Sequence, residues 1–514
     1  MNMNPDNNHT SGEKRHWVRL TRRCNNRCVF CLDGESLDGA LLPSAEIAAD
    51  LRAGRERGAE RAVLSGGEPT VHPDFIGVVA TARRLGYKWV QAVSNGRMFS
   101  YKKFLRDAVA AGLDEITFSL HAHERGLFEA ITCAPGSFSQ ALAGLANALK
   151  SERLVVSVDI VMNRMNAGVL PEIVDFYYRM GVREFDLLFP VPFGRAWLNR
   201  EGVMIEAAEI APVLAGILRT ARARGITFWT NRVPPPALEG LEPFIQSVEK
   251  LHDEVYGRRE MFLDFMERNL PLPCHGERCR RCAMSSFCRM LARLRDGISS
   301  RRKMRYAVTS ENAACLDTVR RDEVDGLCLD NPDLLEHPSV RPFTARHGTA
   351  LTLSCIRFPL PAHYPRGCEM EISVNRHTAP FLLEKGLPSL KNATVFLVYR
   401  GRNSPRECHD EDISLKQFFE RFREKHNVPE NSVRNIPPCI SGARSCARPQ
   451  RVPPDIFNRE NGWNLEALTR HYISDECYYH SMRCAGCARQ ADCPGIHVNY
   501  AAAFGFREIP GPVE

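Results

Sequence analysis

The sequence predicts an α/β fold built on a parallel sheet. Over residues 16–232, six short β-rich runs alternate with amphipathic helical segments. This alternation is typical of a parallel sheet, either open or curled into a partial (β/α)6 TIM-like barrel. Functional side chains of such sheets gather in the loops that follow the strands. The expected strands are His16–Leu20, Arg61–Leu64, Trp89–Ser94, Glu115–Leu120, Leu154–Val161 and Glu184–Phe189.

Helices are expected between these strands because apolar residues recur there at helical spacing. Ser137 and Gln140 have the spacing of a capping box, which predicts the start of one helix. The other expected helices are Ser44–Gly58, Pro73–Gly86 and Val169–Gly181.

The composition is that of an ordinary folded protein. The chain has 514 residues, 44% hydrophobic and 25% charged, which excludes disorder, collagen and coiled coil for the chain as a whole. A net charge of +7 is a mild bias over this length. No apolar run approaches the ~20 residues of a membrane span, and the polar residues 1–15, expected to be disordered, lack the core of a signal peptide. We therefore expect a cytoplasmic protein whose thiols are reduced.

The rest of the chain divides into three expected segments. The prolines of Val233–Pro236 indicate a stiff linker, and a long helical pattern follows over residues 243–269. Strands are expected at Leu351–Ile356 and Thr394–Tyr399, and a helix at Leu415–Lys425. The segments are a linker helix with a first cysteine set at 233–300, an α+β segment of unknown role at 301–435, and a second cysteine region at 436–514.

Three cysteines follow the first expected strand. Cys24, Cys28 and Cys31 form a C-x3-C-x2-C motif in one loop, in a chain that holds 19 cysteines. Three thiolates can bind three irons of a [4Fe–4S] cluster, whereas four are needed to ligate it fully. One iron then stays open to an outside ligand, as in a catalytic zinc site with an open position. A zinc site completed by a distant histidine is the alternative.

A glycine-rich segment ends the second expected strand. It reads Ser65-Gly66-Gly67-Glu68-Pro69. The glycines let backbone come close to a ligand, and the carboxylate of Glu68 can accept a hydrogen bond from an ammonium group.

Together these motifs resemble those of the radical S-adenosylmethionine (radical SAM) superfamily, over about residues 16–230. The resemblance implies a [4Fe–4S] cluster on Cys24, Cys28 and Cys31, with S-adenosylmethionine on the fourth iron. It implies reductive cleavage of that cofactor to a 5′-deoxyadenosyl radical, which takes a hydrogen atom from the substrate. For His121 a loop histidine bonded to backbone is the alternative, and for Arg195 a solvated loop arginine. The residues implied at the cofactor are Phe30, Gly66, Gly67, Glu68, Pro69, Ser94, Asn95, Ser119, His121, Asn163 and Arg195.

Two later cysteine sets repeat one spacing. Each reads Arg-Cys-x2-Cys-x5-Cys, and each is preceded by a proline–cysteine pair. Four thiolates suit a fully ligated [4Fe–4S] cluster or a structural zinc ion, and spacing alone leaves both open. The expected ligands are Cys274, Cys279, Cys282 and Cys288 in the first set, and Cys484, Cys487 and Cys493 with one of Cys439, Cys446 or Cys477 in the second. The repeat favours Cys439.

The two sets resemble the SPASM and twitch auxiliary-cluster regions of radical SAM enzymes, although a long segment separates them. The resemblance implies two auxiliary [4Fe–4S] clusters. The remaining cysteines are expected to be small buried residues. They are Cys133, Cys315, Cys328, Cys355, Cys368, Cys408, Cys446 and Cys477 if Cys439 is the fourth ligand.

The resemblance leaves the substrate open between two classes. Enzymes with auxiliary clusters after the barrel often modify ribosomally made peptides by crosslinking, epimerisation or oxidation, which is the first hypothesis. A dehydrogenase or related enzyme acting on a small-molecule natural-product or sugar intermediate is the alternative, and a non-enzymatic metal scaffold is the alternative of another class. A flavodoxin or ferredoxin is the expected reductant. Nucleic acid is not expected, because the basic runs are short and lack interleaved aromatic residues.

Overall fold

The computed structural model describes residues 14–34, 37–300, 302–345, 349–445, 448–458 and 462–512. Most of the N-terminal segment expected to be disordered lies outside these residues, and the first strand begins at Arg15. The chain forms two compact units, Met1–Gln246 with Gly276–Ala283 and Ser247–His275 with Met284–Glu514. Among the described residues, no helix is both long and apolar enough to cross a membrane.

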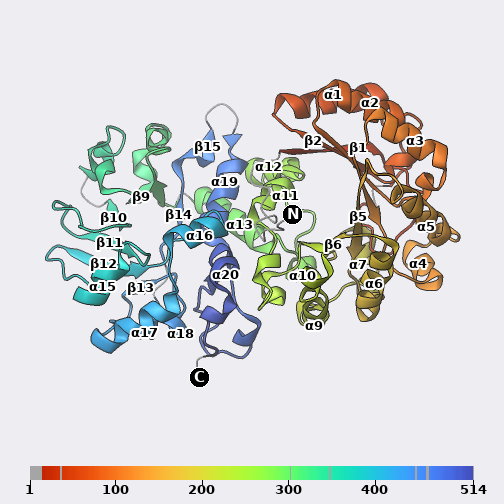
Figure 1. Cartoon of the computed structure of the whole chain (residues 1–514). Coiled ribbons are helices and arrows are strands. Elements are labelled where there is room, and N and C mark those ends of the chain that lie inside the picture. The colour runs from red at the N-terminus through yellow and green to blue at the C-terminus, as the bar shows by residue number, and fades with distance from the viewer. Residues whose placement is uncertain are drawn as a thin grey trace. The chain divides into compact units, whose positions relative to one another are not determined.

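The first unit contains a parallel sheet of seven strands in chain order, β1 to β7, which curls into a half-barrel (Figure 1). Helices α1 to α6 lie on its outer side. The strands are β1 Arg15–Thr21, β2 Arg61–Gly66, β3 Trp89–Ser94, β4 Glu115–Ser119, β5 Val155–Val161, β6 Glu184–Leu188 and β7 Thr227–Asn231. The helices are α1 Ser44–Glu56, α2 Phe75–Arg84, α3 Lys102–Ala111, α4 Arg125–Thr132, α5 Ser137–Ala148 and α6 Leu170–Met180.

The alternation of side chains along each strand separates an apolar face from a polar one. In β1, Val18 and Leu20 are fully buried, whereas Trp17, directly before Val18, is half exposed. On the polar face Glu115 of β4 accepts hydrogen bonds from Arg61 and Gln91 (2.6 and 3.0 Å). The half-barrel therefore has a polar interior at the amino end of its strands, opposite to the strand ends that carry the motifs.

The six expected strands are confirmed, and β7 is an additional seventh. Residues 227–231 alternate between half-buried and buried positions after Gly225, which is the pattern of a short strand. Beyond β6 the unit also contains α7 Gly194–Leu198, α8 Arg200–Val203, α9 Ala207–Leu218 and α10 Ala221–Arg224.

Two helix predictions need correction. Helix α5 begins at Ser137 as expected, but its N-cap is Gly136 and the hydroxyl of Ser137 bonds that of Thr132 (2.9 Å), so no capping box forms. The long helix expected over residues 243–269 is broken into two helices and two 3-10 turns, since α11 spans Leu251–Tyr256 and α12 spans Arg259–Glu267.

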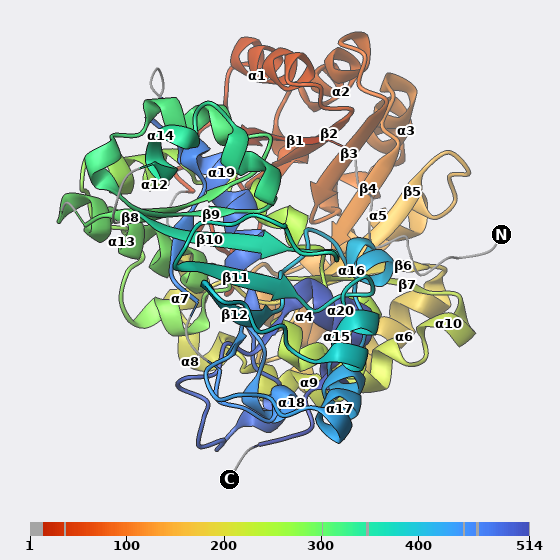
Figure 2. The same cartoon turned by 90° about the vertical axis from the view of Figure 1, so that its left-hand side faces the viewer.

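The second unit contains another seven-stranded sheet, in which every neighbouring pair is parallel (Figure 2). Its order is β13-β12-β11-β10-β9-β8-β14, so the strands from β8 to β13 again follow chain order. The segment expected to mix helices and strands does so, with its strands in this sheet. The strands are β8 Met304–Val308, β9 Val324–Leu329, β10 Ala350–Cys355, β11 Cys368–Ser373, β12 Ala393–Val398, β13 Val433–Arg434 and β14 Arg451–Val452.

Helices and two small antiparallel ladders complete the second unit. The helix expected at Leu415–Lys425 is present with those bounds, as α17. The ladders pair β15 Phe457–Asn458 with β16 Gly462–Trp463 and β17 Tyr478–Tyr479 with β18 Ile496–His497. The other helices are α13 Ser285–Ser299, α14 Arg341–Thr344, α15 Ala379–Lys385, α16 Pro405–Glu411, α18 Pro438–Ser441, α19 Leu465–His471 and α20 Val498–Phe504.

The second sheet repeats local features of the first. After β5 the side chain of Asn163 accepts a hydrogen bond from the amide two residues on (2.9 Å), and after β11 Asn375 does the same (2.8 Å). After β7 Arg232 has a positive φ of 60° and precedes Val-Pro-Pro, and after β13 Asn435 has a φ of 55° and precedes Ile-Pro-Pro. The cysteine repeat is therefore accompanied by matching local features after strands of the two sheets.

Candidate active site

The three-cysteine loop follows β1 and is held by segments that are distant in sequence. Two of its amides donate to carbonyl groups at the end of α4 (2.8 and 2.9 Å), and the carbonyl of Cys31 accepts from the amide of Arg195 in α7 (2.9 Å). Gly194 has a φ of +52°, and a Cβ at this position would lie 2.5 Å from the Cys31 carbonyl oxygen. The loop after β6 can approach the cysteines this closely because residue 194 is glycine.

The three thiols lie close enough to influence one another. Burial and, to a smaller extent, the nearby Glu68 and Cys31 raise the pKa of Cys24 to about 11, against the hydrogen bond from Asn26. Burial also raises the pKa of Cys28, followed by the charges of Cys24 and Cys31. Thiols with such raised pKa values ionise only beside positive charge, and the irons of a cluster would supply that charge. Three gathered sulfurs from one loop thus fit a [4Fe–4S] cluster with one open iron.

Among the described residues, no three His, Cys, Asp or Glu side chains converge tightly enough to hold a single metal ion.

The glycine-rich segment lies against the start of the cysteine loop. The amide of Gly67 donates to Thr21 O (2.8 Å) and that of Glu68 to Arg23 O (2.9 Å). Gly66 has a φ of +137°, and a Cβ there would lie 2.5 Å from Thr21 O. The glycines therefore allow their backbone to approach closely, as expected, and the group that they approach is the start of the loop that carries Cys24.

The carboxylate of Glu68 is buried and occupied by the protein. One oxygen accepts hydrogen bonds from Thr70 N (3.1 Å), Thr70 Oγ1 (2.5 Å) and Ser94 Oγ (2.7 Å), and the other accepts from Asn95 N (2.7 Å). Burial raises its pKa, and these donors lower it. Glu68 thus joins the end of β2 to the end of β3.

Further polar residues hold the cysteine loop, and sequence reasoning missed two of them. Arg97 donates to the carbonyl of Asn25 (2.5 Å), to Asn26 Oδ1 (2.9 Å) and to Gln140 Oε1 (2.7 Å). Asn95 Nδ2 donates to Asn25 Oδ1 (2.6 Å). Asn25 directly follows Cys24 in the motif, but its partners are about seventy positions away, so the sequence carries no signal for the pairing.

Phe30 and His121 form an edge-to-face pair with ring centroids 4.6 Å apart. The ring nitrogen Nδ1 of His121 accepts a hydrogen bond from Val161 N (3.2 Å). Burial lowers the pKa of His121 to about 3, so the ring is neutral at physiological pH. The contacts of His121 are those of a backbone-bonded histidine that positions Phe30 next to Cys31.

The other expected cofactor residues lie at the same edge of the sheet. Asn163 bonds within its own loop, to Val161 O and Met165 N (2.9 Å each). Ser119 ends β4, and Pro69 opens the turn after Glu68. Burial raises the pKa of Cys31, and the charge of the nearby Arg195 offsets part of that rise.

A cavity of about 470 Å³ lies beside the cysteine loop. Its wall consists of residues 23–25, residues 70–73, Met98 and Phe104. Arg23 and Pro73 are solvent-exposed, so the cavity opens to the surface.

In the second unit, four cysteines surround one cavity. Cys439 of α18, Cys484, Cys487 and Cys493 line it together with His480. Burial raises the pKa of Cys439 to about 12, followed by the charges of the other three. The structure thus brings together the set that the repeat favours.

The two other candidates for the fourth position differ in placement. Cys477 is buried and bonds Tyr472 and Tyr479, outside that cavity lining. Cys446 lies outside the described residues.

The first cysteine set is divided between the units. Cys279 and Cys282 belong to the first unit, within and after the 3-10 turn Glu277–Arg281. This turn is attached to its unit by Arg281, which pairs with Glu206 (2.9 Å), and by Arg278, which lies over the ring of Trp197 (5.3 Å). Cys274 and Cys288 belong to the second unit, with Cys288 in α13.

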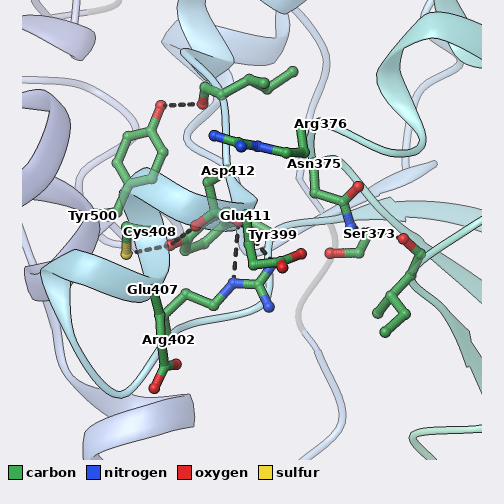
Figure 3. Close-up of polar contacts among 12 residues, drawn as sticks. Ser373, Asn375, Arg376, Tyr399, Arg402, Glu407, Cys408, Glu411, Asp412 and Tyr500 are labelled. Atoms are coloured by element: carbon green, nitrogen blue, oxygen red, sulfur yellow. Dashed lines mark hydrogen bonds and ion pairs between the residues drawn. The ribbon is translucent and has the colours of Figure 1, made fainter.

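A polar cluster at the end of β12 has a structural role (Figure 3). Asp412 accepts hydrogen bonds from Arg402 Nη2 (2.8 Å) and Tyr399 OH (3.1 Å), and Cys408 Sγ lies 3.7 Å from the same hydroxyl. The groups satisfy one another and hold α16 against β12. Cys408 is buried as expected for a cysteine without a metal, whereas Cys133 is exposed.

The first unit matches known proteins. Two archaeal proteins named "Probable GTP 3′,8-cyclase" are similar to this chain. That of Saccharolobus solfataricus is 33% identical over 195 residues, 37% of this chain and 62% of the relative. That of Sulfurisphaera tokodaii is 32% identical over 181 residues, 35% of this chain and 57% of the relative. The chain thus spans about three fifths of the length of these curated relatives.

Two solved structures are similar to part of the chain. SuiB of Streptococcus suis bound to its precursor peptide SuiA has a TM-score of 0.37 at 14% identity, over 43% of this chain and 49% of that one. Native anSMEcpe with bound AdoMet and the Kp18Cys peptide has a TM-score of 0.34 at 13% identity, over 42% of this chain and 63% of that one.

The family comparison covers the half-barrel from β1 to α6, with both of its motifs. Residues 18–177 match the model described as the radical SAM superfamily. This range includes the cysteine loop after β1 and the glycine pair after β2. The chain thus contains a domain, residues 18–177, that matches the radical SAM superfamily.

Proposed function

We propose that this chain is an enzyme that cleaves S-adenosylmethionine reductively and takes a hydrogen atom from its substrate. The observation that carries the proposal is the three-cysteine loop, which α4, α7 and the end of β2 hold at the carboxyl edge of the sheet. A [4Fe–4S] cluster bound by Cys24, Cys28 and Cys31 would supply the electron that breaks the carbon–sulfur bond of the cofactor.

The chain's own residues hold and shield this site. Arg97 and Asn95 fix the loop between the first two cysteines through Asn25. Phe30 and His121 place aromatic surface beside Cys31, at the position expected for the adenine. Because His121 is neutral and bonded to backbone, it contributes orientation and not a proton.

The second part of the proposal concerns the auxiliary sites. Cys439, Cys484, Cys487 and Cys493 would hold a fully ligated [4Fe–4S] cluster in the second unit, and Cys274, Cys279, Cys282 and Cys288 a further one. Support for the first of these is the shared cavity and the mutual electrostatic effect of its thiols. Zinc is the alternative at both, since four thiolates suit either.

As the substrate we propose a ribosomally made peptide that is crosslinked, epimerised or oxidised. The proposal is supported by the two cysteine sets, which resemble the auxiliary regions of peptide-modifying enzymes. A small molecule is the second candidate, and the names of the cyclase relatives favour it, with GTP as the compound to try first.

Product analysis separates the two substrates. The reconstituted chain is incubated anaerobically with S-adenosylmethionine and dithionite, with GTP or with a synthetic peptide encoded next to its gene. We expect 5′-deoxyadenosine to rise with the peptide, whose mass falls by two hydrogen atoms on crosslinking or oxidation and is unchanged on epimerisation. A cyclised nucleotide and no peptide product would instead support the second candidate. An absence of 5′-deoxyadenosine under every condition would contradict the enzyme proposal.

A further inference from the structure

We propose that Arg97 raises the reduction potential of the cluster in the three-cysteine loop, by holding a permanent positive charge beside that loop. The inference rests on the proposed function, because it concerns the cluster that must take up an electron before S-adenosylmethionine can be cleaved. It makes Arg97 a positioning residue that acts on the cluster through the loop and through its charge.

The turn after β3 and helix α5 together fix the place of the Arg97 side chain. Arg97 opens the 3-10 turn Arg97–Ser100, and its amide donates to Asn95 Oδ1 (3.2 Å). Gly96 before it has a φ of +78°, and a Cβ there would lie 2.5 Å from the ring of Phe118. The Nε group of Arg97 donates to Gln140 Oε1 of α5 (2.7 Å). The guanidinium group is therefore held on the side that faces away from the cysteine loop.

The other side of the guanidinium group holds the loop next to Cys24. Its Nη1 atom donates to the carbonyl oxygen of Asn25 (2.5 Å) and to Asn26 Oδ1 (2.9 Å). The amide of Asn26 in turn donates to Cys24 Sγ (3.4 Å). Hydrogen bonds to the sulfurs are among the features that set the potential of an iron–sulfur cluster. Arg97 thus holds the residue whose amide bonds a ligand sulfur.

The charge of Arg97 also acts on that sulfur. The three oxygens that accept from its side chain belong to a carbonyl group and two amide groups, so none of them carries a charge that would neutralise the guanidinium. Burial and the charge of Glu68 raise the pKa of the Cys24 thiol, and the charge of Arg97 lowers it. A cluster that takes up one electron gains one negative charge, and a fixed cation nearby favours that state.

An arginine earlier in the same loop provides a contrast. Arg22, two residues before Cys24, pairs with Asp38 (3.1 Å), and both side chains are about half exposed. An exposed pair of this kind has little effect at a distance, because its two charges offset each other and solvent screens them. Arg22→Gln is therefore a matched control for the loss of one positive charge from the region of the loop.

The test is a redox titration of the reconstituted full chain, in which dithionite supplies one electron to each cluster. The titration follows the electron paramagnetic resonance signal that S-adenosylmethionine alters, and iron is counted in every variant. Arg97→Gln removes the charge, and Arg97→Lys keeps it. Gln140→Glu places a carboxylate on the exposed side of Arg97 and leaves the hydrogen bonds to the cysteine loop in place.

We expect the ratio of reduced to oxidised cluster at a given potential to be about tenfold smaller in Arg97→Gln than in the parent, equivalent to about 59 mV for one electron. Gln140→Glu should change the ratio in the same direction by a smaller factor and keep the iron content of the parent. Arg97→Lys should lie closer to the parent than to Arg97→Gln, and Arg22→Gln should match the parent.

A parent-like potential in Gln140→Glu would overturn the proposal whatever Arg97→Gln shows, including loss of its iron, because the charge would then have no effect. Equal lowering of the potential in Arg22→Gln would also overturn it. Failure of the proposed function is seen separately, as absence of 5′-deoxyadenosine from the fully reduced parent, even where the variants shift in potential as expected.

Discussion

Glu68 shows how one buried side chain positions the site. Its carboxylate accepts hydrogen bonds from both polar groups of Thr70, from Ser94 and from the amide of Asn95. The backbone of the same residue binds the cysteine loop at Arg23. Three strand ends are thereby held in one arrangement around a single residue.

Replacing Glu68 by glutamine should therefore destabilise the fold and loosen the cluster. A glutamine amide keeps one acceptor oxygen and places an NH2 group among buried donors, which costs about 1–3 kcal/mol. Chemical denaturation should show that loss, and anaerobic gel filtration should show weaker iron retention. The control is Glu56→Gln in α1, an exposed position. Parent-like stability and iron retention in Glu68→Gln would show that the network is dispensable.

Residues of the site differ in how far sequence alone predicts them. The three cysteines and the two glycines are recognisable because their role depends on local spacing. Arg97 and Asn25 are not, because they act on each other across 72 positions that only the fold brings together. His121 was expected at the cofactor from its place after a strand, and its bond to Val161 N comes from the neighbouring strand.

At the scale of elements, the first sheet could be predicted because each strand alternates clearly with a helix. In the second sheet, β13 and β14 have two residues each, which is too short to show the alternation of buried and exposed residues that marks a strand. The two strands expected there have continuous apolar runs, and they coincide with β10 and β12 except that their last residues, Ile356 and Tyr399, lie just beyond those strands. Asn163 after β5 and Asn375 after β11 make the same hydrogen bond, which indicates that the loops after these two strands have the same local structure.

An ion cluster joins the strands of the second sheet across its polar face. Glu371 of β11 has no exposed side-chain surface and lies within reach of Arg434 (2.9 Å), Arg451 (2.5 Å) and Arg448 (3.5 Å). Burial raises its pKa, but the three arginines outweigh burial, and the pKa falls to about 2. The two-residue strands β13 and β14 carry Arg434 and Arg451, so this cluster contributes to their attachment.

Replacing Glu371 by glutamine should cost about 3–5 kcal/mol near neutral pH, because buried arginines lose their counter-charge. The folded-state pKa lies below the unfolded value of about 4.3. The stabilisation is thus present above that value and is lost as the pH falls towards 2. Denaturation at a series of pH values should therefore show parent and variant converging in acid, whereas the exposed control Glu424→Gln should follow the parent. A gap that is independent of pH would contradict this account.

At the scale of the whole molecule, the chain consists of two units that each contain a parallel sheet and part or all of a cysteine set. Composition could indicate metal from the cysteine count, and spacing could divide the cysteines into sets. Neither could place the boundary between units inside the first set, because a unit is defined by packing and not by sequence order. A choice among the candidates for the fourth position also needed the fold, which places Cys439 at a cavity that Cys477 does not line.

The second set should load metal independently of the first site. Cys484→Ala should lose about four irons per chain and keep the change in the electron paramagnetic resonance signal that S-adenosylmethionine induces at the first cluster. Loss of zinc and not iron from this variant would assign a zinc site. Parent-like metal content would show that these cysteines hold no metal.

The proposed catalysis requires a cluster at Cys24, Cys28 and Cys31, and substitution of one ligand tests it directly. The parent, Cys28→Ala and the nearby control Cys133→Ser are reconstituted without oxygen, and iron and 5′-deoxyadenosine are measured after reduction with dithionite. Cys28→Ala should lose about four irons and all 5′-deoxyadenosine, while Cys133→Ser should match the parent. Undiminished 5′-deoxyadenosine formation by Cys28→Ala would contradict the assignment of this loop as the catalytic site.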